Sequence, residues 1–189
     1  MSLPFYTIGH STRTLDEFVE LLRAAEVVLV ADIRSVPKSR ANPQYNADVL
    51  PGSLSAFQVG YLHIAELGGL RSAAKGVPPD LNGFWANQSF HNYADYALSA
   101  PFRAGLDRLI AAGRERRCAM MCSEAVWWRC HRRIVADHLI ARGETVLHLM
   151  GRDRIEPATL TPGVRIGASG VVTYPGPGPE SPSETPGAR

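Results

Sequence analysis

The stretch 117–138, RCAMMCSEAVWWRCHRRIVADH, joins three sequence patterns that together indicate the fold. It opens with a short apolar run, Cys118 to Cys122, which has the length of a buried strand. A loop with Glu124 and two tryptophans follows, and from Cys130 onward the apolar residues recur at helical spacing. Proteins of the α/β class usually build their sites on such a strand, loop and helix. We therefore expect the chemical centre of the protein in this stretch.

Similar units precede it. Leu3–Ile8 reads as a strand, and Thr14 with Glu17 forms a capping box, which satisfies free backbone amides at a helix start. Val27–Ala31 is a β-branched run without alternation, as is typical of a strand covered on both faces. Tyr61–Ile64 reads as a third strand.

Further elements alternate in the same way. A short helix is expected over residues 54–59, and longer helices over Tyr93–Leu98 and Phe102–Ala112. Thr145–Leu149 is expected to be the last core strand. This alternation predicts an α/β fold, a single domain with a mostly parallel sheet flanked by helices on both faces. Long irregular loops interrupt the pattern, so the strand order stays open.

The composition changes near the end of the chain. Residues 1–156 are expected to form the α/β domain, and residues 157–189 a C-terminal extension. A hairpin is possible over residues 164–174. From Pro175 onward the chain is rich in Pro, Gly, Ser and Glu, which predicts a flexible tail.

The overall composition narrows the class of protein. The 189 residues are 45% apolar and 20% charged, as in ordinary globular proteins. A net charge of +2 does not by itself indicate nucleic-acid binding. No signal peptide or membrane span is recognisable. Three cysteines make a disulfide framework improbable, so free thiols and a cytoplasmic location are expected.

Polar side chains follow each of the five expected strands. The carboxyl ends of parallel strands share one edge of a sheet, so we expect these side chains to meet in one pocket. The candidate catalytic residues are His10, Asp32, Cys122 and Glu124. The candidate substrate-binding residues are Ser11, Arg34, Arg40, Gly68, Gly69, Arg71, Tyr93, Cys130, His131 and Arg132.

Several of these residues also have a structural explanation. His10 could cap a turn, and Asp32 with Arg34 could form a structural ion pair. Gly68–Gly69 permits a tight turn, although bare amides there could also hold an anion. His148 fits a hydrogen-bonded core residue better than a catalyst.

Metal binding is a weaker expectation. Cys122, Cys130 and His131, with His10 or His148 added, are ligand types that zinc prefers. The gap between the two cysteines lacks the tight spacing of a structural zinc motif. No metal site is therefore predicted, and the cofactor is left open.

Several segments resemble the domain of unknown function 488 family. They are Thr7–Ser11, Val30–Arg34, Leu67–Arg71, Met121–Glu124 and Cys130–Arg132. The resemblance spans roughly residues 3–150, and it departs at Val126 and Trp127, where the family often has an acidic residue and a proline. It implies a single α/β domain with a site, but no established reaction.

The first functional hypothesis is an enzyme. Arginine favours carboxylates and phosphates because its planar fork donates two parallel hydrogen bonds. The basic residues near the expected pocket therefore predict an anionic partner, a phosphate-bearing small molecule, nucleotide or nucleic-acid component. Glu124 or Asp32 would act as acid or base, and His10 would carry a proton, in hydrolysis or group transfer.

Two alternatives remain. In a thiol-based redox protein, Cys122 would react and Cys130 would resolve the oxidised form. In a nucleic-acid or ligand-binding module without catalysis, Tyr45, Trp127 and Trp128 would stack on bases. The oligomeric state is not predicted.

Overall fold

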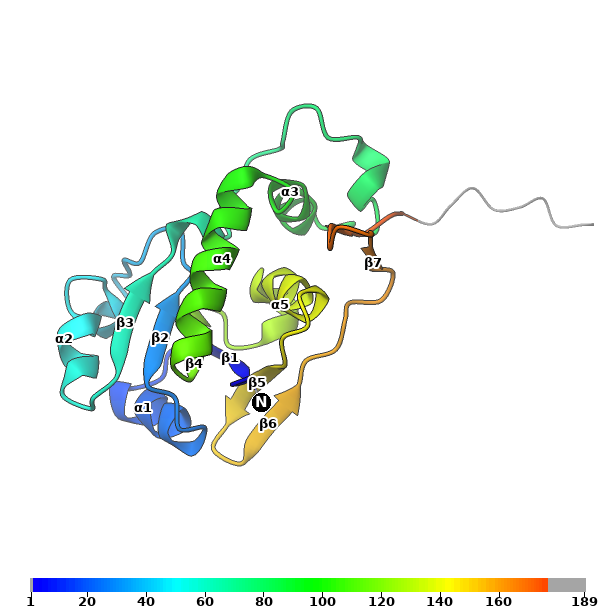
Figure 1. Ribbon diagram of the computed structural model, residues 1–189. Coiled ribbons are helices and arrows are strands. Elements are labelled where there is room, and N and C mark those ends of the chain that lie inside the picture. The colour runs from blue at the N-terminus through cyan, green and yellow to red at the C-terminus, as the bar shows by residue number, and fades with distance from the viewer. Residues whose placement is uncertain (1, 177–189) are drawn as a thin grey trace, which may run out of the picture.

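The computed structural model describes residues 2–176, which form a six-stranded sheet with helices on both faces (Figure 1). The strand order is β3-β2-β4-β1-β5-β6, in which the first five strands are parallel and β6 is antiparallel to β5. The predicted α/β class is confirmed. The strands are β1 Phe5–Gly9, β2 Leu29–Asp32, β3 Gly60–His63, β4 Cys118–Cys122, β5 Val146–Gly151 and β6 Arg154–Pro157.

Each face of the sheet carries its own apolar core. Successive side chains of a strand point to opposite faces. On β4, Cys118 and Met120 face the core under α3, α4 and α5, while Ala119 and Met121 face the core under α1 and α2. The helices are α1 Leu15–Ala24, α2 Leu50–Ser55, α3 Gln88–Tyr96, α4 Ala100–Glu115 and α5 Arg132–Ala141. None of those in residues 2–176 combines the length and apolarity that crossing a membrane needs.

The starts of the helices follow from their capping residues. The capping box at α1 is confirmed, since Thr14 and Glu17 each accept a hydrogen bond from the other's backbone amide. α3 begins at Gln88 rather than Tyr93, because the Asn87 side chain accepts from two amides of the first turn. The helix expected at 54–59 lies instead at Leu50–Ser55, with a proline in its first turn.

Thr145–Leu149, expected as the last core strand, corresponds to β5, whose Val146 and Leu149 lie in the two cores. A mostly exposed strand that was not expected follows it. β6 adds to β5 as an antiparallel edge, because the chain turns back directly after Gly151. Two short strands, β7 Arg165–Ile166 and β8 Val172–Thr173, then pair as a hairpin.

The described part of the C-terminal extension packs against the domain. Tyr174 is fully buried, and its hydroxyl donates to Asp137 of α5 at 2.8 Å. Its backbone amide donates to Asn82 Oδ1 at 3.0 Å. The region therefore joins α5 to the loop before α3. The flexible tail predicted from Pro175 onward lies almost wholly in residues 177–189, outside the described residues.

One histidine of α5 is buried without a hydrogen-bond partner at Nε2 within the described chain. His138 is 7% exposed and lies against Phe102, with 4.7 Å between the ring centroids. Burial lowers the pKa of His138 from 6.5 to about 4, so the imidazole is neutral in the folded protein at pH 7.

This burial predicts a loss of stability in acid. The unfolded chain binds a proton at His138 below pH 6.5, whereas the folded chain does so only near pH 4. Stability is therefore lost as the pH falls from 6.5 towards 4, by about 3 kcal/mol from this residue. His138→Phe should flatten that part of the curve of unfolding free energy against pH in urea titrations. A curve parallel to that of the unchanged protein would contradict this assignment.

Candidate functional site

A cavity of about 750 Å³ lies where the loops after β1, β2 and β4 meet. It brings together eight of the residues predicted from the sequence: His10, Ser11, Arg34, Gly69, Cys122, Glu124, Cys130 and His131. Six others do not line it: Asp32, Arg40, Gly68, Arg71, Tyr93 and Arg132. The expected convergence of polar strand ends thus occurs for β1, β2 and β4, whereas His63 and Glu66 at the end of β3 and His148 of β5 do not line the cavity.

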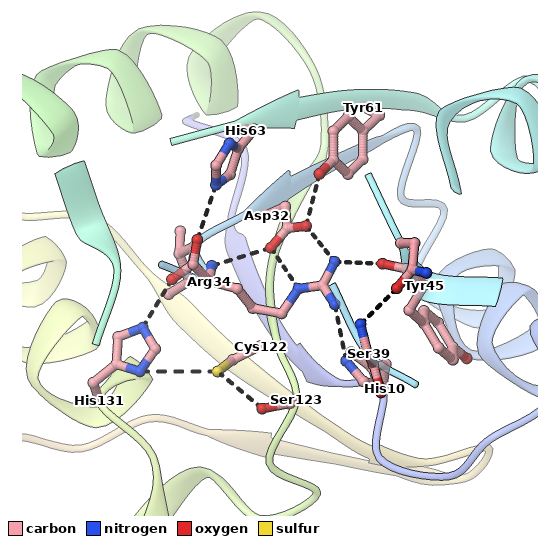
Figure 2. Close-up of polar contacts among 12 residues, drawn as sticks. His10, Asp32, Arg34, Ser39, Tyr45, Tyr61, His63, Cys122, Ser123 and His131 are labelled. Atoms are coloured by element: carbon pink, nitrogen blue, oxygen red, sulfur yellow. Dashed lines mark hydrogen bonds and ion pairs between the residues drawn. The ribbon is translucent and has the colours of Figure 1, made fainter. Parts of the chain in front are cut away.

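Arg34 is held in place by a buried ion pair (Figure 2). Asp32 receives hydrogen bonds from Arg34 Nε at 2.9 Å and Nη2 at 2.6 Å, and from the Tyr61 hydroxyl at 2.7 Å. Arg34 Nη2 also donates to the carbonyl of Tyr45 at 2.6 Å. Asp32 is 0% exposed, so it fixes Arg34 and does not face a ligand. This corrects the expectation that Asp32 is a catalytic acid or base.

His10 also belongs to this buried network. Its Nδ1 donates to the carbonyl of Ser11 at 2.9 Å, and its Nε2 accepts from Arg34 Nη1 at 3.2 Å. The ring stacks on Tyr45, with centroids 4.2 Å apart. Burial, with the charge of Arg34, lowers the pKa of His10 to about 4. His10 is therefore a neutral imidazole with both nitrogens engaged, a poorer proton carrier than expected.

Two thiols and an imidazole meet on another wall of the cavity. We call Cys122, Cys130 and His131 the sulfur–imidazole cluster. His131 Nδ1 lies 3.8 Å from Cys122 Sγ and 3.6 Å from Cys130 Sγ. All three ligand-type atoms lie within 4.8 Å of one another.

The orientation of the His131 ring is fixed by its neighbours. Nε2 lies 3.0 Å from the carbonyl of Ile33, which can only accept a hydrogen bond, so Nε2 carries a proton. The rings of Tyr93 and His131 pack in a T-shaped arrangement, with centroids 5.0 Å apart. A Cβ on Gly69 would come within 2.5 Å of Nδ1. The glycine is therefore needed for close approach to His131, and Tyr93 acts behind the site.

The two thiols have unlike surroundings. Burial alone would raise the pKa of Cys130, but a hydrogen bond from Cys122 and the charge of Arg132 lower it. The hydrogen bond to Cys130, together with burial, raises the pKa of Cys122. Arg132 Nε lies 3.3 Å from Cys130 Sγ. Arg132 is 1% exposed and its guanidinium lies against Cys130 Sγ, so it does not reach a ligand in the cavity.

The loop that carries Glu124 is fastened through its backbone. Arg132 Nη2 donates to the carbonyl of Glu124 at 2.6 Å. The amide of His10 donates to the carbonyl of Cys122, and the amide of Ser11 to the carbonyl of Ser123, both at 2.9 Å. Within residues 2–176 no hydrogen bond or ion pair engages the carboxylate of Glu124, which lines the cavity and is exposed. This carboxylate is available for proton transfer.

The positive charge in the cavity comes from two residues besides Arg34. Lys38 and Arg129 line it, and their side chains form no ion pair within the described part of the chain. Arg71 donates instead to the carbonyls of Gly68 and Ala65 at 2.8 Å, and Arg40 is exposed outside the cavity. Closeness to site residues along the sequence did not distinguish the arginines that line the cavity from those that do not.

A comparison with protein-family models shows which family the chain belongs to. The model described as "Domain of unknown function DUF488" matches residues 14–139. The chain belongs to the DUF488 family. No curated protein and no solved structure matches the chain.

Some cavity residues of this DUF488 domain were not predicted from the sequence. Leu70, from the loop before α3, and Ser89 and Phe90, from the first turn of α3, also line the cavity. Conversely, Tyr45 is 0% exposed, and Trp127 stacks on His148 with centroids 4.5 Å apart. These two aromatic rings are engaged inside the DUF488 fold, so they do not present a free surface for bases.

Replacing Asp32 should show how much the site of this DUF488 domain depends on its ion pair. Asp32→Asn leaves the Arg34 guanidinium buried without a counter-charge, which should lower the free energy of unfolding by about 3 to 5 kcal/mol. Tyr61→Phe is the matched control, since it removes one neighbour of the same carboxylate and should cost about 1 kcal/mol. Equal effects of the two variants in urea unfolding would refute a dominant role for the pair.

Proposed function

We propose that the protein is an enzyme that catalyses hydrolysis or group transfer on an anionic, phosphate-bearing small molecule. One observation carries the proposal. Lys38, Arg129, the carboxylate of Glu124 and the sulfur–imidazole cluster all line the same cavity. A cleft that combines cations with several reactive side chains is more typical of catalysis than of simple binding.

The cavity suits a ligand with both an anionic and an apolar part. Lys38 and Arg129 would bind the phosphate, assisted by the hydroxyls of neighbouring serines. Val36 and Leu70 are 63% and 78% exposed at the cavity, and Phe90 also lines it. Such side chains support contact with a base or another planar group, so a nucleotide is a suitable substrate class.

The roles of the remaining residues follow from their partners. Glu124 would give or take the proton of the reaction, because its carboxylate is the one predicted acidic group that faces the cavity. His10 and Asp32 would keep Arg34 in position. The three cysteines are free thiols, which supports a reducing compartment such as the cytoplasm.

Removing the cavity cations should weaken anion binding. Lys38→Ala and Arg129→Ala should each lower the affinity for inorganic phosphate and for a nucleoside monophosphate by about tenfold in calorimetric titrations, since each removes a charged hydrogen bond. Arg40→Ala is the matched control, because Arg40 is exposed outside the cavity. A similar loss in all three variants would indicate nonspecific charge effects and would count against the cavity as the binding site.

Replacing Glu124 should separate catalysis from binding. Glu124→Gln keeps the size of the side chain but removes its proton transfer, so turnover should fall by about 10²-fold or more with ligand affinity retained. A panel of phosphate esters and nucleotides supplies the test substrates, and Glu20→Gln, on the exposed side of α1, is the control. A turnover equal to that of the unchanged protein on a substrate it processes would remove Glu124 from the mechanism.

A further inference from the structure

We propose that the sulfur–imidazole cluster is a zinc site in which Cys122, Cys130 and His131 are the ligands and the fourth position opens to the cavity. The inference about metal binding stands on the geometry of the cluster alone. Only the chemical role of the metal rests on the function proposed above.

The distances within the cluster fit a tetrahedral ion. With Zn–S near 2.3 Å and Zn–N near 2.0 Å, the edge from sulfur to nitrogen of a tetrahedral site is about 3.6 Å. The Nδ1 atom of His131 lies 3.8 Å from Cys122 Sγ and 3.6 Å from Cys130 Sγ. One ion could therefore contact all three atoms with only small shifts of the side chains.

The imidazole is already in the form that a metal needs. Nε2 of His131 donates to the carbonyl of Ile33 at 3.0 Å, which leaves the lone pair of Nδ1 directed at the two sulfur atoms. A ligating histidine usually donates its other ring nitrogen to a carbonyl or carboxylate in this way. Gly69 and Tyr93 pack on the ring and hold it in this orientation.

The sulfur atoms also have the outer partners of metal-bound thiolates. The backbone amide and Nε of Arg132 lie 3.5 Å and 3.3 Å from Cys130 Sγ, and both can donate to a thiolate. Ser123 Oγ lies 3.9 Å from Cys122 Sγ. Two thiolates and one imidazole favour zinc over magnesium or calcium, which prefer oxygen.

The fourth coordination position distinguishes a catalytic zinc site from a structural one. Structural zinc sites are closed by four protein ligands, whereas catalytic sites have three and keep one position for water or substrate. In the described residues the cluster has three ligand groups, and all three line the cavity with Glu124, Lys38 and Arg129. A bound ion would face the anion held by those cations.

Metal titration of the full chain tests the inference. The reduced, chelator-treated protein should bind one Co²⁺, with the charge-transfer absorption of thiolate ligands and the visible bands of tetrahedral coordination. Zn²⁺ should displace the cobalt. Cys122→Ser, Cys130→Ser and His131→Asn should each lower the affinity for Zn²⁺ by at least about 100-fold, since even outer-shell changes cost 10- to 100-fold. Cys118→Ala, on the same strand but outside the cluster, should bind as the unchanged protein does.

A second measurement avoids reliance on variants that fail to fold. In the unchanged protein, Zn²⁺ should protect Cys122 and Cys130 from alkylation, as read by peptide mass spectrometry. Absence of both cobalt absorption and protection would overturn the inference, as would rapid formation of a Cys122–Cys130 disulfide in the presence of Zn²⁺. Lys38→Ala should leave the cobalt spectrum unchanged. Metal binding with no phosphate affinity would thus refute the proposed function alone, and phosphate affinity without metal binding would refute the zinc site alone.

Discussion

The buried pair of Asp32 and Arg34 is the constraint on which the rest of the site depends. A charge taken from water is tolerated only with a counter-charge and satisfied hydrogen bonds. Here one guanidinium links the end of β2 to the His10 ring, to the carbonyl of Tyr45 and, through Asp32, to the Tyr61 hydroxyl of β3. The long loop after β2 is thereby fixed on the sheet edge, and this loop forms one wall of the cavity.

The opposite wall depends on how two neighbouring strands diverge. β1 and β4 lie side by side, but β1 leads to α1 on one face and β4 leads towards α5 on the other. Open α/β sheets place their ligand crevices at such points. In this protein the two loops also touch, because Gly9 approaches the Glu124 carbonyl so closely that a Cβ would lie 1.8 Å from it. This contact sets where the backbone turns towards Cys130 and His131.

The sequence was a good guide to the fold and a partial guide to the site. Uninterrupted apolar runs identified β2 and β4, since strands buried on both faces need them. β6 was missed because an edge strand with Arg154 and Glu156 carries no such run. At the site, the rule that the carboxyl ends of parallel strands share one edge correctly placed His10, Arg34, Cys122 and Glu124 in one cavity.

The same rule could not assign partners to charged side chains. Arg71 and Arg132 look like anion ligands in the sequence, but the guanidinium of Arg71 donates to backbone carbonyls and that of Arg132 to a carbonyl and a sulfur. These partners lie close in the chain, at Gly68 and Ala65 for Arg71 and at Cys130 and Glu124 for Arg132, but the turn of each loop decides which nearby atoms a guanidinium meets. The spacing of Cys122 and Cys130 likewise concealed their proximity, because the intervening loop folds back on itself before α5.

The strand order also has a consequence for self-association. One edge of the sheet ends in the antiparallel β6, and the other ends in β3, which is only the four residues Gly60–His63. A strand added at the β3 edge would find few unpaired backbone amides, because β3 is short. The helix α2 also packs beside β3. Short, partly covered borders of this kind oppose the sheet-to-sheet addition that leads to aggregation. The protein can thus keep an open sheet without closing it into a barrel.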